Sequence, residues 1–177
     1  MDRIRIASSD RLSAGEMTAL RGFLDEAFEG DFSDDDAAHA LGGHHALIAR
    51  GGRIVAHGAL VPRTLWAGER EFAAGYVEAV AVAPADRQQG LGSAIMRALA
   101  RQLVRRYEIG ALSTGEPAFY ARLGWERWAG PTYVRTAGAL RRTPEEDDGI
   151  MVMRFGPSAL ADLHRPLVCL DRPGDAW

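Results

Sequence analysis

The segment Tyr76–Ser93 has the residue types and spacing needed to hold a phosphate group. An apolar, β-forming run ends at Val82, a polar turn follows, and a helical pattern begins after the turn. Gly90 and Gly92 let the backbone approach a ligand closely, because glycine has no Cβ. The first turn of a helix adds N–H groups without intrahelical acceptors and the positive end of the helix dipole. The turn is therefore predicted to bind a pyrophosphate, with Arg87 adding a charge-assisted hydrogen bond.

Two common nucleotide-binding motifs do not fit this turn. The phosphate-binding loop of NTPases ends in Gly-Lys followed by Ser or Thr, and the chain contains no lysine. The dinucleotide motif needs a third glycine at the position that Ile95 occupies here. The pattern that remains is Arg87-x-x-Gly90-x-Gly92, which also occurs at helix starts that bind no ligand.

This pattern, behind the Val80-Ala81-Val82 strand end, resembles the coenzyme A pyrophosphate motif of the GNAT acetyltransferase superfamily. The resemblance implies that acetyl-CoA binds as a cosubstrate and that no metal is needed. It also implies that N–H groups near Val80 and Val82 hold the thioester carbonyl and the pantetheine arm. The residues that it places at the coenzyme are Val80, Ala81, Val82, Arg87, Gln88, Gln89, Gly90, Leu91, Gly92 and Ser93.

A second segment, 119–125, resembles another motif of this superfamily, a helix followed by a Gly-aromatic turn. In the superfamily the tyrosine of this helix lies near the sulfur of the coenzyme, which here implies Tyr120. A phenol, with a reference pKa near 10, can act as general acid and protonate the departing thiolate. The alternative is that Tyr120 is an ordinary half-buried aromatic residue.

Four segments together resemble the aminoglycoside 2′-N-acetyltransferases. They are Gly30-Asp31-Phe32 with Asp36 behind it, the stretches 41–48 and 75–82, and the Gly174-Asp175-Ala176-Trp177 tail. In that family acidic side chains and the terminal carboxylate hold the ammonium groups of the antibiotic. The substrate-binding residues implied here are Asp31, Asp36, Glu78, Ser113, Asp148, Asp175 and Trp177.

The distribution of acidic residues suits a polycation. No arginine lies between Arg21 and Arg50, an interval that holds seven acidic residues, and four more stand together at 145–148. Two opposite charges about 4 Å apart attract by roughly 1 kcal/mol in water and about 4 kcal/mol at an effective dielectric constant near 20. Carboxylates that converge in a partly enclosed site would bind a polycation, whereas separate acidic loops would only be solvated. A shift of one position within 145–148 would exchange Asp148 for a neighbour.

Glu78 is the candidate general base. An amine with a reference pKa of about 10.4 is almost entirely protonated at pH 7, so a proton must leave before it can attack a thioester. Glu78 lies in the strand that leads into the coenzyme motif, and two-residue alternation places it on the face of Tyr76, Val80 and Val82. The resembling family has a glutamate here; the alternative is a salt bridge across the sheet. Cys169, the only cysteine, is far from both motifs in sequence, so we expect direct transfer in a ternary complex.

Composition excludes several classes of protein. The net charge is −3, from 24 acidic and 21 basic residues, which argues against a nucleic-acid binder. No apolar run reaches the length of a membrane span, and the N-terminus lacks the pattern of a secretory signal, so we expect a cytoplasmic protein. The superfamily resemblance implies a homodimer.

Two alternative functions stay open. One is an acetyltransferase for another cationic amine, such as a polyamine, an aminosugar precursor or a protein N-terminus. The other is a non-catalytic module that binds acyl-CoA or an aminoglycoside.

The elements that must position these residues follow from hydrophobic periodicity. We expect a strand at 4–7, a helix from its cap Ser13 to near Gly30 with Glu16 completing a capping box, and a short helix within 31–41. Strands are expected at 46–50, 53–66 and up to Val82, then a helix over 91–107, a strand at 109–113, a helix at 117–123, and strands near 125, at 150–155 and at 167–170. Pro62 predicts a bulge, an edge or a break in its strand. The expected fold class is α/β (α+β), the GNAT fold, over a single domain, 1–177. It has a mixed, mostly antiparallel sheet with a central βαβ crossover and helices on both faces.

His44 and His45 invite a metal interpretation because acidic residues precede them. No third ligand falls at a recognised spacing, and the corresponding stretch of the resembling family is structural. We therefore expect no metal.

Overall fold

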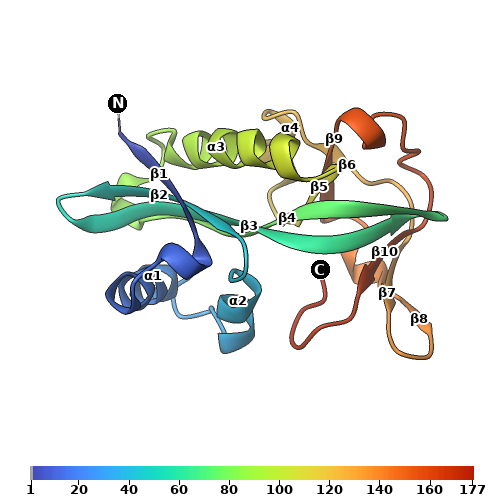
Figure 1. Ribbon diagram of the computed structural model, residues 1–177, viewed down its shortest axis with the longest axis horizontal. Coiled ribbons are helices and arrows are strands. Elements are labelled where there is room, and N and C mark those ends of the chain that lie inside the picture. The colour runs from blue at the N-terminus through green and yellow to red at the C-terminus, as the bar shows by residue number, and fades with distance from the viewer. Residues whose placement is uncertain (1) are drawn as a thin grey trace. The chain divides into compact units, whose positions relative to one another are not determined.

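The computed structural model describes residues 2–177, which form two compact units (Figure 1). Unit 1 contains the chain up to Val61 and the segment Val77–Gln102; unit 2 contains Pro62–Tyr76 and Leu103–Trp177. Strands β3 and β4 and helix α3 each contribute residues to both units. That the chain is a single domain stays a prediction.

Unit 1 is built on antiparallel strands. β1 (Ile4–Ser8) pairs with β2 (His44–Arg50), and β2 pairs with β3 (Arg53–Ala67), which neighbours β4 (Arg70–Val82). The hairpin between β2 and β3 turns through Gly51 and Gly52, which both have positive φ angles, +55° and +79°. Two adjacent left-handed residues form the tight turn that matches the twist of paired strands, so the expected two-residue hairpin is confirmed.

Helices cover both faces of this sheet. α1 (Ala14–Ala27) begins at the predicted capping box of Ser13 and Glu16, and its buried face packs Leu20, Phe23 and Leu24 in one core with Leu47 and Ala81. α2 (Asp34–His39) follows, also with a capping box. On the opposite face, α3 (Leu91–Arg106) places Ile95 and Leu99 against Gly58, where a Cβ atom would lie only 2.8 Å from Ile95. A larger residue at position 58 would push α3 away from the strand.

Unit 2 contains the remaining elements. They are β5 (Ile109–Ser113), α4 (Pro117–Ala121), β6 (Glu126–Arg127), β7 (Thr132–Arg135), β8 (Leu140–Arg142), β9 (Ile150–Arg154) and β10 (Leu167–Leu170), with short 3-10 turns at Pro144–Glu146 and Gly156–Ser158. Unit 1 has 3-10 turns at Ser9–Arg11 and Pro84–Asp86. The strand order is β6-β9-β5-β4-β3-β10-β7-β8. β4 and β5 are parallel, so the expected βαβ crossover through α3 is confirmed.

Sequence periodicity did not identify β7 and β8. These strands pair with each other, and β7 also pairs in parallel with β10. They are short, and β8 carries two arginines, so neither has the run of apolar residues that marks a buried strand. Pro62 lies inside β3, between the stretch that pairs with β2, up to Leu60, and the stretch that pairs with β10, from Leu65. A residue without an N–H group is tolerated where the strand changes partners.

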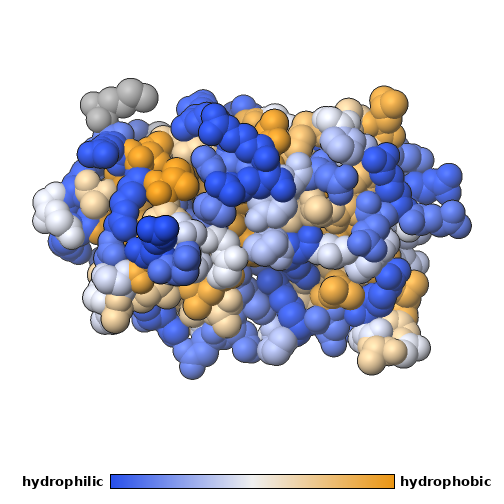
Figure 2. Space-filling view, in the orientation of Figure 1, coloured by the Kyte–Doolittle hydropathy of each residue, from blue (hydrophilic) through white to orange (hydrophobic). Residues whose placement is uncertain are grey.

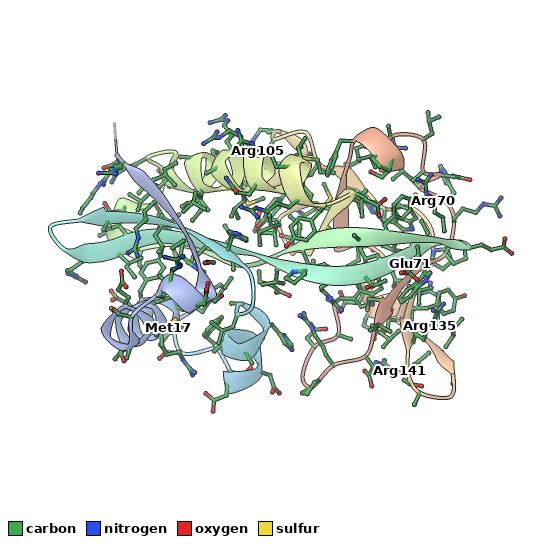
Figure 3. The ribbon with its side chains drawn as sticks, viewed as in Figure 1. Met17, Arg70, Glu71, Arg105, Arg135 and Arg141 are labelled. Carbon is green, nitrogen blue, oxygen red and sulfur yellow. The ribbon has the colours of Figure 1, made fainter. Side chains whose placement is uncertain are left out.

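The hairpin end of β3 and β4 is held by aromatic and charged side chains (Figure 3). The indole nitrogen of Trp66 donates to Glu71 at 3.0 Å, and the guanidinium of Arg135 lies 4.0 Å from the centre of the Trp66 ring. The guanidinium of Arg70 likewise covers Phe72. Trp66 is half-buried and Phe72 is buried, and the stacked arginines help to shield both rings from water.

The face of the molecule that Figure 2 draws carries many hydrophilic residues. On the face drawn in Figure 2, hydrophobic residues form small, separated groups among hydrophilic ones. Within residues 2–177, no helix has both the length and the hydrophobicity required to cross a bilayer.

Candidate functional site

Unit 1 carries the glycine-bearing loop that leads into α3. Gln88 and Gly90 both have left-handed backbones, with φ angles of +63° and +78°. Left-handed residues beside a helix N-terminus are typical of loops whose N–H groups bind an anion. The loop residues 88–90 are exposed, so the loop is accessible to a ligand.

Hydrogen bonds of two arginines, Arg50 and Arg87, hold this loop in place. Arg50 donates to Gln89 at 2.8 Å and to Asp86 at 2.5 Å, and its other end is paired with Asp2 at 2.8 Å. These contacts raise the pKa of Arg50, mainly through the hydrogen bond with Asp2. Arg87 donates to the carbonyl of Ala27, at the end of α1, at 3.2 Å. No local pattern in the sequence identified Arg50, because its partners are 36 to 48 residues away.

The β4 strand contains a local distortion beside the loop. Ala79 has a φ angle of +49°, a left-handed conformation that costs a non-glycine residue roughly 1–2 kcal/mol. Beyond it, Val80 points toward α3 and Ala81 toward α1. Ala79 and Ala83 pack against the same core as Ala81, so two-residue alternation continues past Ala79, and the face of Glu78 stays a prediction.

The three acidic site residues predicted in unit 1 have different environments. Glu78 is half-buried in β4, and Asp31 is exposed before α2. Asp36 takes part in the capping box of α2: its Oδ2 accepts from the N–H and the hydroxyl of Ser33, at 2.9 and 2.8 Å. Asp36 thus has a structural use, which does not depend on a ligand.

Tyr120, in unit 2, is a buried residue of α4. Its ring meets Phe119 edge to face, with centroids 4.9 Å apart, and it lies near Trp125, with centroids 6.4 Å apart. Burial raises the pKa of the Tyr120 phenol, an effect that a hydrogen bond with Thr114 partly opposes. The phenol is therefore protonated at neutral pH, which a proton donor requires.

Three side chains of the acidic run 145–148 have different surroundings. Glu146 is half-buried and accepts a hydrogen bond from the hydroxyl of Ser113 at 3.1 Å. Burial raises the pKa of Glu146, and the negative charge of Asp175 raises it further. Asp147 is paired with Arg142 and also accepts from Thr132, and the arginine lowers the pKa of Asp147.

Asp148, the residue assigned from sequence, is differently placed. Its side chain is 88% exposed and forms an ion pair with Arg127. Of the four residues in the run, Glu146 is the one that is hydrogen-bonded to another predicted ligand, Ser113, and its charge is close enough to be repelled by that of Asp175. The sequence contains no signal that separates these neighbours, because the register of a 3-10 turn decides which side chain faces which way.

The C-terminal tail is anchored to unit 2 by several hydrogen bonds. The indole nitrogen of Trp177 donates to Thr143 at 3.1 Å, and Trp177 is 4% exposed. Arg63 donates to the carbonyl of Ala176 at 2.7 Å, and Arg172 donates to the main-chain oxygen of Trp177 at 3.3 Å. Asp175 accepts from the N–H of Trp177 at 3.1 Å but stays exposed. The anchoring fixes the position of Asp175 relative to Glu146.

Cys169 is fully buried and bonds to the tail through the carbonyl of Ala176 at 3.4 Å. Burial raises the pKa of the thiol to about 11. Because the thiolate is the nucleophilic form, this cysteine is unreactive at neutral pH.

Neither His44 nor His45 belongs to a metal-binding group in the described part of the chain, where no three His, Cys, Asp or Glu side chains converge. The ring of His45 is instead hydrogen-bonded to the ring of His57, its Nδ1 lying 2.9 Å from Nε2 of His57.

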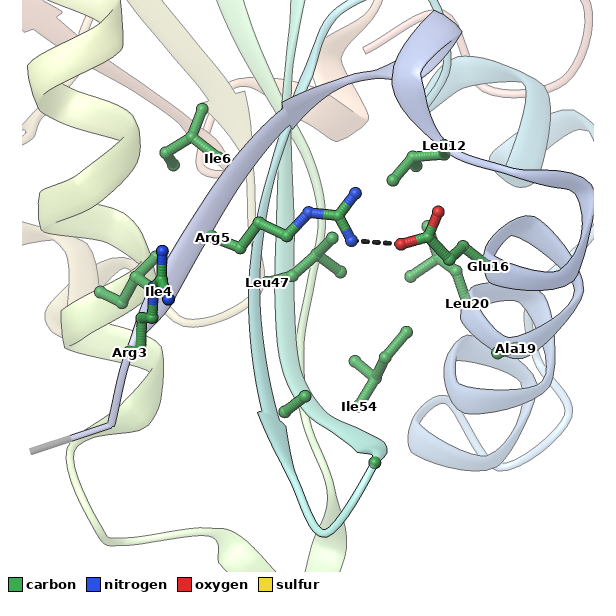
Figure 4. Close-up of a pocket in the computed structure, with 12 residues that line it drawn as sticks. Arg3, Ile4, Arg5, Ile6, Leu12, Glu16, Ala19, Leu20, Leu47 and Ile54 are labelled. Carbon is green, nitrogen blue, oxygen red and sulfur yellow. Dashed lines mark hydrogen bonds and ion pairs between the residues drawn. The ribbon is translucent and has the colours of Figure 1, made fainter.

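A cavity of about 670 Å³ lies between β1 and α1 (Figure 4). Its walls are mainly apolar, with Leu12, Leu20, Leu47 and Ile54 among them, and the ion pair of Arg5 and Glu16 spans it. None of the site residues predicted from the sequence lines this cavity.

Comparisons with known proteins agree on one family. Residues 9–128 match the family model described as an acetyltransferase (GNAT) domain. The chain is 41% identical to an aminoglycoside 2′-N-acetyltransferase of Mycolicibacterium fortuitum, over 98% of this chain and 91% of that protein.

Solved structures share the fold. The N-acetyltransferase YhbS of Escherichia coli, solved in complex with CoA, superposes with a TM-score of 0.69 and 20% identity, over 95% of this chain and 89% of that one. A GNAT acetyltransferase of Brucella melitensis, solved with acetyl-CoA, gives a TM-score of 0.60 and 18% identity, over 89% and 92% of the two chains. The fold class expected from the sequence is thereby confirmed.

Proposed function

The chain belongs to the GNAT acetyltransferase family, and we propose that it transfers the acetyl group of acetyl-CoA to the 2′-amino group of an aminoglycoside. The observation that carries this proposal is the 41% identity to the M. fortuitum enzyme over 98% of the chain. We propose that the two units form one catalytic domain, that the protein is cytoplasmic, and that it forms a homodimer.

In this proposal unit 1 holds the acetyl donor. The N–H groups of residues 88–93 bind the pyrophosphate, the helix dipole of α3 favours its negative charge, and Arg87 adds a further cation. Main-chain groups of Val80, Ala81 and Val82 orient the pantetheine arm and the thioester. Arg50 supports the loop without touching the ligand, since its guanidinium is engaged with Asp2, Asp86 and Gln89.

Acidic groups bind the ammonium groups of the acceptor. Glu146, Asp175 and the hydroxyl of Ser113 form one polar group in unit 2, which offers carboxylate oxygens on a partly buried surface. An ammonium ion there gains more than on an open surface, because attraction strengthens as the effective dielectric constant falls. Asp31, Asp36, Asp148 and the C-terminal Trp177 are further proposed ligands, with Asp148 the least favoured because Arg127 already neutralises it.

The reaction removes two protons from the acceptor nitrogen and adds one to the departing sulfur. Glu78 accepts the first proton from the 2′-ammonium group, directly or through water, and the neutral amine attacks the thioester carbon. The C–N bond forms, the nitrogen of the tetrahedral intermediate releases its second proton to water, the intermediate collapses, and the C–S bond breaks. Tyr120 donates its phenolic proton to the departing thiolate, which leaves as CoA. Because the Cys169 thiol is buried and unreactive, the transfer is direct.

A comparison of two acceptors tests this function. Kanamycin B has an amine at position 2′ and kanamycin A has a hydroxyl there, so the pair isolates the proposed acceptor group. Release of free thiol from acetyl-CoA is measured with each antibiotic, and the product is located by NMR. We expect turnover with kanamycin B and none above background with kanamycin A.

The other outcomes separate the alternatives. Similar rates with both antibiotics would show acetylation at another amine and remove the 2′ assignment. Turnover with neither antibiotic, together with measurable binding of acetyl-CoA, would indicate either another acceptor amine or a binding protein. Thiol release with a polyamine as acceptor would then favour the first of these two explanations.

A further inference from the structure

Two buried histidines connect the surface of unit 1 to the distorted residue of β4. His57 Nδ1 lies 2.8 Å from the carbonyl oxygen of Ala79, and His57 Nε2 lies 2.9 Å from His45 Nδ1. His45 Nε2 lies 2.9 Å from the hydroxyl of Ser9, which in turn accepts from the N–H of Gly42 at 3.0 Å. We call Ser9, His45 and His57 the histidine chain. Both rings are completely buried.

The carbonyl oxygen of Ala79, at the end of the histidine chain, determines which atom donates in each of its hydrogen bonds. A carbonyl oxygen can only accept, so Nδ1 of His57 must carry a proton. A neutral imidazole has one N–H group, so Nε2 of His57 accepts from Nδ1 of His45. By the same reasoning, Nε2 of His45 accepts from the hydroxyl of Ser9. Burial lowers the pKa of His57 to about 3 and that of His45 to about 4, so both rings are neutral at physiological pH.

The histidine chain ends at the residue that joins Glu78 to Val80. Ala79 holds a left-handed φ of +49°, which persists only where its surroundings enforce it. The hydrogen bond from His57 fixes its carbonyl oxygen, and through that peptide plane it fixes where the N–H of Val80 points. The residue on the other side is Glu78. A small rotation at Ala79 therefore moves both the proposed base and a proposed coenzyme contact.

We propose that His57 is a positioning residue for acetyl transfer: through Ala79 it sets the orientation of Glu78 and of the N–H of Val80. His45 and Ser9 hold His57 in the tautomer that donates to Ala79. This inference rests on the proposed function of Glu78. It also gives His45, one half of the His44-His45 pair, a use in which no metal takes part.

A purely structural role is a less complete account. Two apolar side chains would fill the same space without the cost of burying polar rings, a cost that only satisfied hydrogen bonds offset. A fully satisfied buried network specifies one geometry, because each bond orients the next. The geometry specified here is that of the one left-handed residue within β4.

Imidazole tautomers provide the first test, which does not involve catalysis. Long-range ¹H–¹⁵N NMR of the wild-type protein distinguishes a protonated from an unprotonated ring nitrogen. We expect His45 and His57 both to carry the proton on Nδ1 and to have an unprotonated Nε2 at pH 7. A proton on Nε2 of His57, or a charged ring, would overturn the inference.

Steady-state kinetics provide the second test. His57→Asn keeps an N–H donor near the position of Nδ1, whereas His57→Leu removes it at similar volume. We expect His57→Leu to lower kcat by about 10- to 100-fold, the effect of a small misplacement of a catalytic group, with little change in KM for the antibiotic. His57→Asn should restore kcat to within about threefold of the wild type. Ser9→Ala, at the far end, should lower kcat only about two- to threefold.

Ile48→Val is the matched control, because Ile48 is fully buried in β2 but makes no bond in the histidine chain. It should lower the melting temperature without lowering kcat. A loss of kcat in this control equal to that of His57→Leu would show that activity follows stability alone, which would overturn the inference. Ser9→Ala and His57→Asn keep the test valid if His57→Leu does not fold.

A double mutant shows whether His57 acts through Glu78. If it does, His57→Leu lowers kcat less in the Glu78→Gln background than in the wild type, because one of the two groups that it positions is already lost. Multiplied losses would overturn the inference while leaving the base role intact. Full activity of Glu78→Gln would instead contradict the proposed base and overturn the positioning role with it.

Discussion

The hydroxyl of Ser113 donates a hydrogen bond to the carboxylate of Glu146, 3.1 Å away, and thereby joins the end of β5 to the acidic run 145–148. Asp175, from the anchored tail, adds its negative charge to the same group. Three segments that are distant in sequence thus place anionic and polar atoms together on unit 2. Such a group suits a cation that has lost part of its water.

Replacing Glu146 with Gln should raise KM for the aminoglycoside about tenfold, since a charge-assisted hydrogen bond contributes about 1.5–3 kcal/mol. KM for acetyl-CoA should not change. The matched variant Asp148→Asn should change neither constant by more than about twofold, because an exposed ion pair contributes little. A larger rise in KM for Asp148→Asn than for Glu146→Gln would assign the ligand role to Asp148 instead.

The pH dependence of binding should identify the same residue. Burial and Asp175 raise the pKa of Glu146, so it becomes protonated at a higher pH than an ordinary glutamate. A protonated carboxyl does not attract an ammonium group, so KM for the antibiotic should rise as the pH falls toward that pKa. The variant Glu146→Gln should lack this rise, and an identical profile in both proteins would assign the effect to another group.

Tyr120→Phe should lower kcat by about 10²-fold or more, the usual contribution of a general acid. The enzyme should retain some activity, since orientation of the two substrates contributes more than a single proton transfer. Phenylalanine fills the same buried space, so the melting temperature should fall little. Unchanged kcat would make Tyr120 a packing residue only.

Gly90→Ala should weaken acetyl-CoA binding specifically. The residue has a φ of +78°, and a Cβ atom added there would meet nothing within 4 Å, so the substitution strains the backbone without a steric clash. We expect KM for acetyl-CoA to rise about fivefold, in line with roughly 1 kcal/mol of backbone cost. Gly15→Ala in α1, where the added Cβ also meets nothing, is the control and should leave both KM values unchanged.

Thr143→Val should loosen the C-terminal tail. It removes the acceptor of the Trp177 indole and leaves a buried N–H without its partner, at a cost of about 1–3 kcal/mol. We expect lower stability to denaturant, a change in tryptophan fluorescence and a higher KM for the antibiotic. Thr18→Val on the exposed face of α1 should show none of these changes.

The buried histidines should make the protein less stable in acid. Burial lowers the pKa of His45 to about 4, while in the unfolded chain a histidine titrates near 6.5. Below pH 6.5 the unfolded state therefore binds more protons than the folded state, and stability falls as the pH decreases toward 4. The slope is at most about 1.4 kcal/mol per pH unit for each histidine.

Urea denaturation at about pH 6.5, 5.5 and 4.5, the interval between the two pKa values, measures this slope. The variant His57→Asn removes one of the two groups, so its free energy of unfolding should depend less on pH over this interval. Equal slopes for the wild type and the variant would show that His57 takes up its proton in the folded state as readily as in the unfolded one.

Local chemistry along the chain was sufficient to predict much of this protein. The capping box of Ser13 and Glu16, the Gly51-Gly52 hairpin and the α3 boundary all depend on residues within a few positions of one another, and all three agree with the structure. The glycine-bearing loop was proposed as the pyrophosphate site for the same reason, since its glycines and the helix start are contiguous; its phosphate binding stays a prediction. Resemblance added the acetyl-CoA and aminoglycoside assignments.

Tertiary structure decided what depends on distant contacts. Arg50 reaches the loop from β2, Glu146 meets Ser113 and Asp175, and His57 reaches Ala79 from a neighbouring strand. Each contact joins residues that are 22 or more positions apart along the chain. Periodicity determines which face of an element is buried, but the orientation of one carboxylate or one ring nitrogen is set by the packing of several elements at once, and no local pattern contains that information.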